Sequence, residues 1–125
     1  MTCLASFDDL HELPVRPIWD GVVARVFSGE RLSVGVVELD ANAVVPEHQH
    51  EQEQLGMVLK GSLTFRIEDE TVDLGPGGTW SIPSNAPHEV TVGPEGAVVI
   101  DVFAPVRSDW ESRDELESRP PLWPT

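Results

Sequence analysis

Closely spaced glycine, proline and asparagine residues divide this chain into short apolar or alternating segments, and that pattern limits the folds open to it. Segments of this kind favour β-strands, and the turn-forming residues between them favour tight reversals. Strands are predicted at 22–27, 32–39, 55–59, 63–67, 71–74, 79–82, 88–92 and 98–103. Turns are predicted at Ser28-Gly29, Ala41-Asn42, Lys60-Gly61, Gly75 to Gly78, Ser84-Asn85 and Gly93-Pro94. Many short strands at regular spacing predict an all-β protein, either an antiparallel sandwich or a barrel.

One segment outside this pattern is typical of a helix. It runs from 108 to 118, with Ser108 as the expected N-cap and acidic residues in the first turn, and Pro120-Pro121 would end it. The chain has 125 residues, of which 40% are hydrophobic, so it has enough apolar material for one core. We therefore expect a single domain over residues 1–125, with the barrel core at about 20–105 and a C-terminal tail at 106–125.

Charge and composition exclude several classes of partner. The chain carries 22 acidic and 8 basic residues, and its net charge of -14 repels nucleic-acid phosphates and anionic lipid surfaces. The N-terminus lacks a basic start followed by a long apolar run, and no segment reaches the ~20 apolar residues of a membrane span. We therefore expect a cytoplasmic location, with no nucleic-acid or membrane partner. Cys3 is the only cysteine, which excludes an internal disulfide and a cysteine-based zinc site.

Three of the four histidines fall in one arrangement, with His48 and His50 separated by one residue and His88 following a proline. On a strand His48 and His50 would project from the same face, because strand side chains repeat with a period of two. A third imidazole and an amide or carboxylate oxygen from neighbouring strands would complete four protein ligands, a set that suits zinc, iron, nickel or manganese. The sequence therefore predicts a metal site inside a sheet. His11 fits no motif and is expected to be exposed.

These residues resemble the two motifs of the cupin superfamily. The first motif, Gly-x5-His-x-His-x3–4-Glu-x6-Gly, is represented here by Asn42, His48, His50, Gln54 and Gly61. The second motif, Gly-x5-Pro-x-Gly-x2-His-x3-Asn, is represented by Gly77, Pro83, Asn85, His88 and Val92. The resemblance implies a jelly-roll barrel that binds one divalent metal ion, of which zinc, nickel, iron and manganese are candidates. The ligands that it implies are His48, His50, Gln54 and His88.

The departures from the motifs affect chemistry more than fold. Asn42 and Asn85 replace glycines, and asparagine is the non-glycine residue that best tolerates a positive φ, so both turns are expected to survive. Gln54 replaces a glutamate, so the ligand set of three imidazoles and one carboxamide would leave the metal its full positive charge. Glu51 or Glu53 would be the fourth ligand instead if the local turn shifts.

A narrower resemblance lies in the segment from Asp101 to Asp109, which is similar to the Asp-Val-Phe-x-Pro-x-Arg-x-Asp segment of the pectin-degradation cupins. Those enzymes open the rings of unsaturated monouronates. The resemblance implies that Asp101 and Phe103 point into the barrel beside the metal and that Arg107 binds a substrate carboxylate. An alternative role for Arg107 is surface pairing with Asp109 or Glu111.

Two further residues bear on the pocket wall. Met57 stands where many relatives have an aromatic residue, so the wall is expected to differ there. Packing is the expected role of Trp80, and among the tryptophans it is the one best placed to face the pocket.

The predicted function is that of a divalent-metal-dependent cupin. We expect a redox-neutral isomerase, lyase or hydratase acting on a small oxygenated acid such as an unsaturated uronate, with Asp101 moving a proton. The alternatives are an Fe(II)-dependent dioxygenase and a non-catalytic small-molecule-binding cupin. A further alternative is a polyketide-cyclase-type cupin with an apolar wall of Met57, Phe103 and Trp80. The expected partners are a small-molecule substrate and a second copy of the chain in a homodimer.

Overall fold

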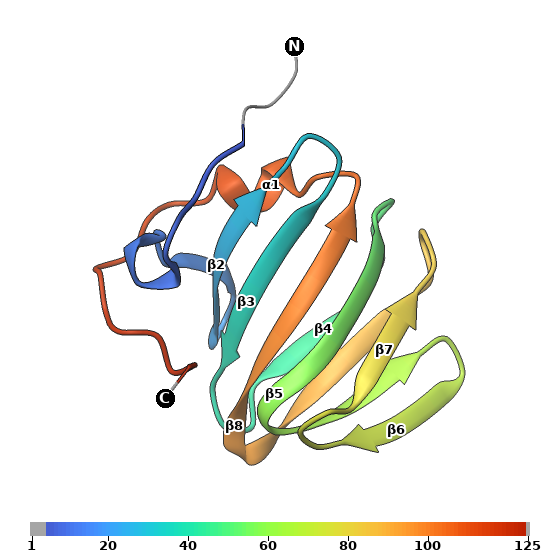
Figure 1. The fold of residues 1–125 in the computed structure, drawn as a ribbon. Coiled ribbons are helices and arrows are strands. Elements are labelled where there is room, and N and C mark those ends of the chain that lie inside the picture. Colours follow the sequence, from blue (N-terminus) through green and yellow to red (C-terminus); the bar gives the residue numbers. More distant parts are fainter. Residues whose placement is uncertain (1–4, 125) are drawn as a thin grey trace.

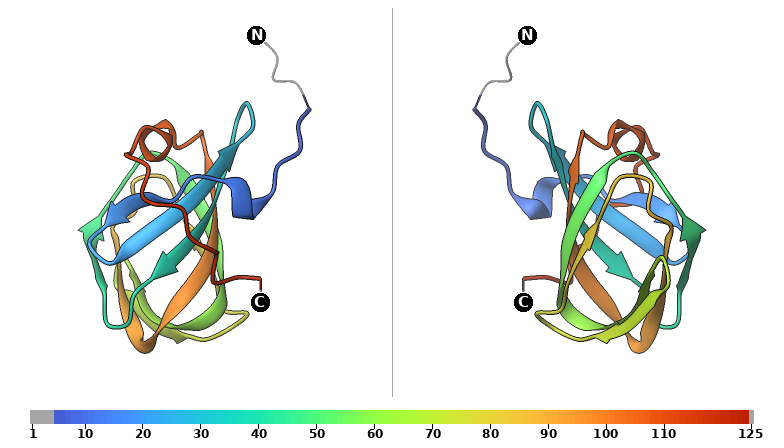
Figure 2. Two further views of the ribbon diagram at one scale, coloured as in Figure 1. Left: turned by 90° about the vertical axis from the view of Figure 1, so that its left-hand side faces the viewer. Right: turned by 90° about the vertical axis from the view of Figure 1, so that its right-hand side faces the viewer.

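Antiparallel strands make up most of the structure, a computed structural model that describes residues 5–124 and therefore leaves Cys3 outside the described part. The strands are β1 (Arg16–Trp19), β2 (Val22–Ser28), β3 (Ser33–Leu39), β4 (Val44–His48), β5 (Glu53–Ile67), β6 (Glu70–Leu74), β7 (Thr79–Ile82) and β8 (His88–Ala104). Their order in the sheet is β1-β2-β3-β8-β5-β6, and in addition β4 pairs with β8 and β7 pairs with β5. The sheet curves into an all-β jelly-roll barrel, as predicted (Figures 1 and 2).

Two long strands each join a pair of predicted strands. β5 runs through Lys60-Gly61, where its register against β8 shifts on both sides and Gly61 has a φ of 78°. β8 runs in the same way through Gly93-Pro94. The predicted turns at these two places are wrong, because a glycine inside a strand also permits a bulge that bends the strand without ending it. Each bent strand therefore belongs to two faces of the barrel.

Two strands were not predicted, and both contain a proline. β1 includes Pro17 and β4 includes Pro46, and proline argues against a strand because it cannot donate a backbone hydrogen bond. Both are strands with a single described partner, since β1 pairs with β2 alone and β4 with β8 alone. A strand that is paired on one side tolerates proline, because the missing donor can face away from its neighbour.

The turns that depend on asparagine form as predicted. Asn42 and Asn85 have φ values of 63° and 64°, in the left-handed region that the motif glycines would occupy. The second of these turns precedes β8 and sets the position of His88. Asparagine at these two sites therefore preserves the turn that joins β3 to β4 and the turn that joins β7 to β8.

The C-terminal helix is shorter than predicted. α1 spans Ser108–Glu111 and is anchored by the buried Trp110. A short 3-10 turn lies near the other end of the chain, at Leu10–Glu12. Its N-cap is Arg107, which makes no side-chain cap, so the prediction of Ser108 as the N-cap is wrong. The chain after α1 runs along the outside of the barrel (Figure 2). There the amide of Leu122 donates to Glu38, which also forms a buried ion pair with Arg25.

The barrel interior is filled by apolar side chains from both faces, including Val37, Leu39, Phe65, Val90 and Val99. These five apolar residues line one cavity together with the polar side chains described next. Within residues 5–124 no helix is long and apolar enough to cross a membrane.

Candidate metal centre

Three imidazoles converge at one cavity of the barrel. His48 ends β4, His50 follows it in the next loop, and His88 begins β8 directly opposite His48 in the strand register. The ring centroids of His48 and His88 are 4.2 Å apart, and one ring nitrogen from each of the three histidines lies within 4.8 Å of the others. The predicted histidine set is therefore assembled, although β4 holds only the first of the two neighbouring histidines.

Backbone carbonyls fix which nitrogen of each imidazole carries the proton. Nδ1 of His48 lies 2.9 Å from Pro46 O, Nδ1 of His50 lies 3.0 Å from Gln52 O, and Nδ1 of His88 lies 2.9 Å from Ala86 O. A carbonyl only accepts, so each Nδ1 donates and each Nε2 keeps its lone pair. Lone pairs on three converging Nε2 atoms are what a metal ion needs.

Burial keeps these imidazoles neutral. It lowers the pKa of all three, and it lowers the pKa of His88 to about 4. The positive charge of Arg107 acts in the same direction on each of them. At neutral pH a metal would therefore not have to displace protons from these ligands.

Gln54 supplies an oxygen beside them. Its Oε1 lies 3.1 Å from Nε2 of His50, and its Nε2 donates to Oδ1 of Asp101 at 2.8 Å. With the proton of His50 on Nδ1, the facing atoms are both acceptors, and two acceptors at this distance repel unless a cation lies beside them. The donor set thus fits a metal ion held by three imidazoles and one amide oxygen. Glu51 and Glu53 are exposed, so Gln54 is the residue of this segment that faces the cavity.

Asp101 is buried on β8 next to this group. Its Oδ1 accepts from Gln54 and from Nε1 of Trp80 at 2.9 Å. Burial raises the pKa of Asp101 to about 6, while these two hydrogen bonds and the charge of Arg107 oppose the rise. A carboxyl group with a pKa near the working pH suits proton transfer.

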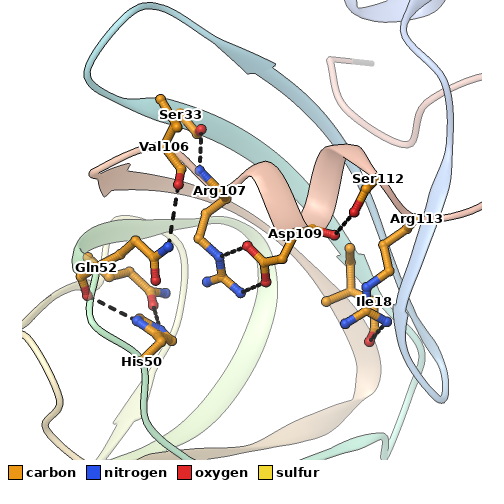
Figure 3. A network of polar contacts seen from close by, with 10 residues as sticks. Ile18, Ser33, His50, Gln52, Val106, Arg107, Asp109, Ser112 and Arg113 are labelled. Carbon is orange, nitrogen blue, oxygen red and sulfur yellow. Dashed lines mark hydrogen bonds and ion pairs between the residues drawn. The ribbon is translucent and has the colours of Figure 1, made fainter.

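Arg107 pairs with Asp109, which is one of the two roles predicted for it. Its side chain is buried, with the guanidinium carbon 4.6 Å from the ring centroids of both Phe103 and Trp110. Its Nε and Nη2 donate to the two oxygens of Asp109, each at 3.0 Å (Figure 3). Its ionic partner is thus Asp109, while Glu111 accepts from Ser28. Phe103 lies between this cation and the imidazoles, with its ring centroid 5.9 Å from that of His50.

Contacts through backbone atoms connect His50 to the loop that holds Arg107. The carbonyl of Gln52 accepts from His50, and the side-chain amide of Gln52 donates to Val106 O at 3.4 Å (Figure 3). The backbone nitrogen of Arg107 donates to the buried hydroxyl of Ser33 at 2.8 Å. Gln52 and Ser33 were not predicted, because no residue pattern reveals a contact made through a backbone atom.

The cavity that these residues line has a volume of about 60 Å³. The imidazoles, Gln54, Asp101, Phe103, Trp80 and Arg107 all line it, so the predicted site residues share one cavity. Trp19 also lines it, with its ring centroid 5.1 Å from that of His48, and was not predicted. A volume this small, well below the ~300 Å³ of the smaller drug-binding pockets, fits only a small ligand or the reacting end of a larger one.

Met57 does not belong to the cavity wall, so that prediction is wrong. Alternation along β5 places Gln54 and Val58 inside and turns Leu55 and Met57 outward, where they are 51% and 37% exposed. Their neighbours on β8 are Val102 and Ile100. These four side chains form an apolar patch on the outside of the barrel, and a polyketide-type wall that includes Met57 cannot form.

Comparison with known proteins agrees with this architecture. The family model of the cupin domain matches residues 35–103, more than half of the chain. The chain belongs to the cupin family. The matched range contains the three imidazoles, Gln54 and Asp101, whereas Arg107 and Asp109 lie beyond it.

The chain is also similar to individual cupins. It is 30% identical over 101 residues to the pectin degradation protein KdgF of Dickeya dadantii, which covers 79% of this chain and 92% of that one. The structure of KdgF from Halomonas sp. superposes with a TM-score of 0.78 at 30% identity, over 85% of this chain and 98% of that one. The polyketide cyclase RemF of Streptomyces resistomycificus gives a TM-score of 0.71 at 24% identity, over 82% and 80% of the two chains, and shows the shared fold alone.

Proposed function

We propose that this protein is a metal-dependent cupin that opens the ring of an unsaturated monouronate in a redox-neutral isomerisation. The observation that carries the proposal is a single cavity shared by three neutral imidazoles, a buried carboxyl group with a raised pKa and a buried arginine. The similarity to pectin degradation proteins named KdgF supports a sugar acid as the substrate.

In this proposal one divalent ion is held by His48, His50, Gln54 and His88. Zinc, nickel, iron and manganese all suit a set of imidazole and oxygen ligands, so the residues do not select one of them. When bound, the ion supplies Lewis acidity, which stabilises negative charge on a substrate oxygen. The four ligands are neutral, so none of them offsets the charge of the ion.

Arg107 is proposed to bind the substrate carboxylate. Two of its nitrogens are occupied by Asp109, which leaves Nη1 to donate to an anion in the cavity. Cation–π contacts with the rings of Phe103 and Trp110 hold the guanidinium in place. Because the chain has a net charge of -14, this buried cation supplies the local attraction that an acidic substrate needs.

Asp101 is proposed to move the proton. The two donors that reach it within the described residues, Gln54 and Trp80, both use Oδ1, so Oδ2 is the oxygen assigned to exchange with substrate. Ring opening removes a proton from the anomeric hydroxyl, breaks the bond between the anomeric carbon and the ring oxygen, and adds a proton at the enol carbon. The product is an isomer, so the reaction consumes no oxidant, reductant or water.

The test follows the absorbance of the conjugated enol acid after unsaturated galacturonate is added to metal-loaded protein. We expect its loss to be faster than the spontaneous ring opening and to require the bound metal. A rate equal to the spontaneous one would refute the uronate substrate. Oxygen consumption by the Fe(II)-loaded protein, measured with an electrode in the same samples, would favour the dioxygenase alternative.

A further inference from the structure

Trp80, Gly56 and Asp101 lie in one row across three neighbouring strands. Gly56 of β5 is paired with Trp80 of β7 on one side and with Asp101 of β8 on the other. Strands two places apart in a sheet are separated by roughly 10 Å, twice the spacing of neighbours, so their side chains do not normally meet over the strand between them. Here Nε1 of Trp80 donates to Oδ1 of Asp101 at 2.9 Å.

Gly56 is what allows this contact. A Cβ atom built on Gly56 would overlap both Nε1 of Trp80 and Oδ1 of Asp101. The φ of Gly56 is not positive, so the glycine is not needed for the backbone conformation. The absence of a side chain at position 56 therefore serves the hydrogen bond that crosses above it.

The contact determines which way the amide of Gln54 points. An indole N–H only donates and an ionised carboxylate only accepts, so Oδ1 of Asp101 is an acceptor toward both of its neighbours. The NH₂ group of Gln54 must face Asp101, and its oxygen must face His50. An amide oxygen can bind a metal ion and an amide NH₂ cannot, so this orientation decides whether Gln54 is a ligand at all.

We propose that Trp80, acting through Asp101 above Gly56, is a positioning residue of the metal centre that holds the oxygen of Gln54 toward the ion. This inference rests on the proposed metal binding by Gln54 and the three histidines. It gives Asp101 two separate tasks, with Oδ1 orienting Gln54 and Oδ2 serving proton transfer. Such partners of metal ligands typically change metal affinity by about 10- to 100-fold when they are removed.

Trp80→Phe is the test variant, because Trp80 also packs on Phe65 at a centroid distance of 4.8 Å and a phenylalanine ring retains packing there. The measurement is Zn²⁺ affinity by competition with a chromophoric chelator, on apo protein and without substrate. We expect Trp80→Phe to weaken Zn²⁺ binding by about tenfold, the lower end of the range, because Trp80 contacts Asp101 and not Gln54 itself. An unchanged affinity would overturn the proposal.

A double-mutant cycle separates positioning from packing. In a Gln54→Ala background, where three imidazoles still bind Zn²⁺, Trp80→Phe should cause no further loss, because there is no amide left to orient. The same loss in both backgrounds would assign Trp80 to packing and overturn the proposal. The visible spectrum of the Co²⁺-loaded protein should follow the same pattern, with a change on Trp80→Phe only when Gln54 is present.

Gly56→Ala provides a second, independent variant. It should weaken Zn²⁺ binding at least as much as Trp80→Phe, whereas Gly75→Ala, at which a Cβ atom meets nothing within 4 Å, should leave the affinity unchanged. Equal affinities for both alanine variants would contradict the proposal. Because no substrate is used, an inactive protein that shows the expected coupling refutes only the uronate reaction. A ring-opening enzyme without the coupling refutes only the role of Trp80.

Discussion

Replacement of Arg107 by alanine should chiefly raise KM. In the proposed complex the guanidinium contributes one charge-assisted hydrogen bond from Nη1 to the substrate carboxylate, worth about 1.5–3 kcal/mol. At ~1.4 kcal/mol per factor of ten, KM should rise about 10- to 150-fold. The carboxylate is held in the ground state and the transition state alike, so kcat should change little. The assay is steady-state loss of enol-acid absorbance over a range of unsaturated galacturonate concentrations.

Stability must be measured beside these kinetics, since the same guanidinium packs between two aromatic rings, Phe103 and Trp110. Cation–π contacts contribute about 0.5–2 kcal/mol each, so Arg107→Ala should also lower the free energy of unfolding in urea. Arg107→Lys keeps the charge but not the fork geometry, and its KM should fall between those of wild type and Arg107→Ala. A fall in kcat at unchanged KM would refute the binding role, because the interaction would then be made only in the transition state.

Four further results are expected. His48→Ala should lose most of its bound divalent metal by elemental analysis while His11→Ala keeps it, and equal loss would contradict the metal assignment. Asp101→Asn should lower kcat by roughly 10²- to 10⁴-fold with KM and metal content little changed, because its amide oxygen can still accept from Gln54 while its proton-transfer role is lost; unchanged turnover would remove that role. The hydrogen bonds from Arg107 lower the pKa of Asp109, so their stabilisation is present above the unfolded pKa and is lost as the pH falls through the lower folded pKa. Asp109→Asn should therefore reduce the free energy of unfolding by up to about 1 kcal/mol at pH 7 and not at strongly acidic pH, and a pH-independent loss in urea titrations would contradict this. The apolar patch around Leu55 has neutral side chains on a highly acidic chain, so we expect it to join two copies of the chain. Leu55→Glu should therefore give a monomer by light scattering where the wild type gives a dimer. A monomeric wild type would contradict this role of the patch.

The fold and the histidine set could be predicted because they depend on local patterns. Asn42 and Asn85 mark turns by their tolerance of positive φ, and the spacing of His48, His50 and His88 follows two sequence motifs. The contact between Trp80 and Asp101 could not be predicted, since it depends on which strands become neighbours and on an empty position between them. Side-chain chemistry alone does not contain that information.

The same limit explains the strand errors. Proline in β1 and β4 argues against a strand unless it is known that each has a neighbour on one side only, which is a property of the assembled sheet. Likewise Lys60-Gly61 has the composition of a turn, and only the pairing of β5 with β8 on both sides of it makes the segment a bulge. The wrong prediction for Met57 has a different cause, because alternation from Gln54 already places Met57 on the opposite face of the strand.

The bend in β8 has a consequence for how this chain tolerates insertions and deletions. His88 and Asp101 are separated by 13 positions (101 − 88), and in a regular strand an odd separation puts two side chains on opposite faces. Both nevertheless line the same cavity, so the bend between them inverts the alternation once. If a single residue were removed at the exposed stretch Pro94-Glu95 and the bend kept its shape, the arm after the bend would slip by one position, and Asp101 and Phe103 would turn to the outside while His88 stayed within. The number of residues in this bend therefore decides whether Asp101 and Phe103 line the cavity, and changes of one residue there should be harmful even though the bend itself does not line it.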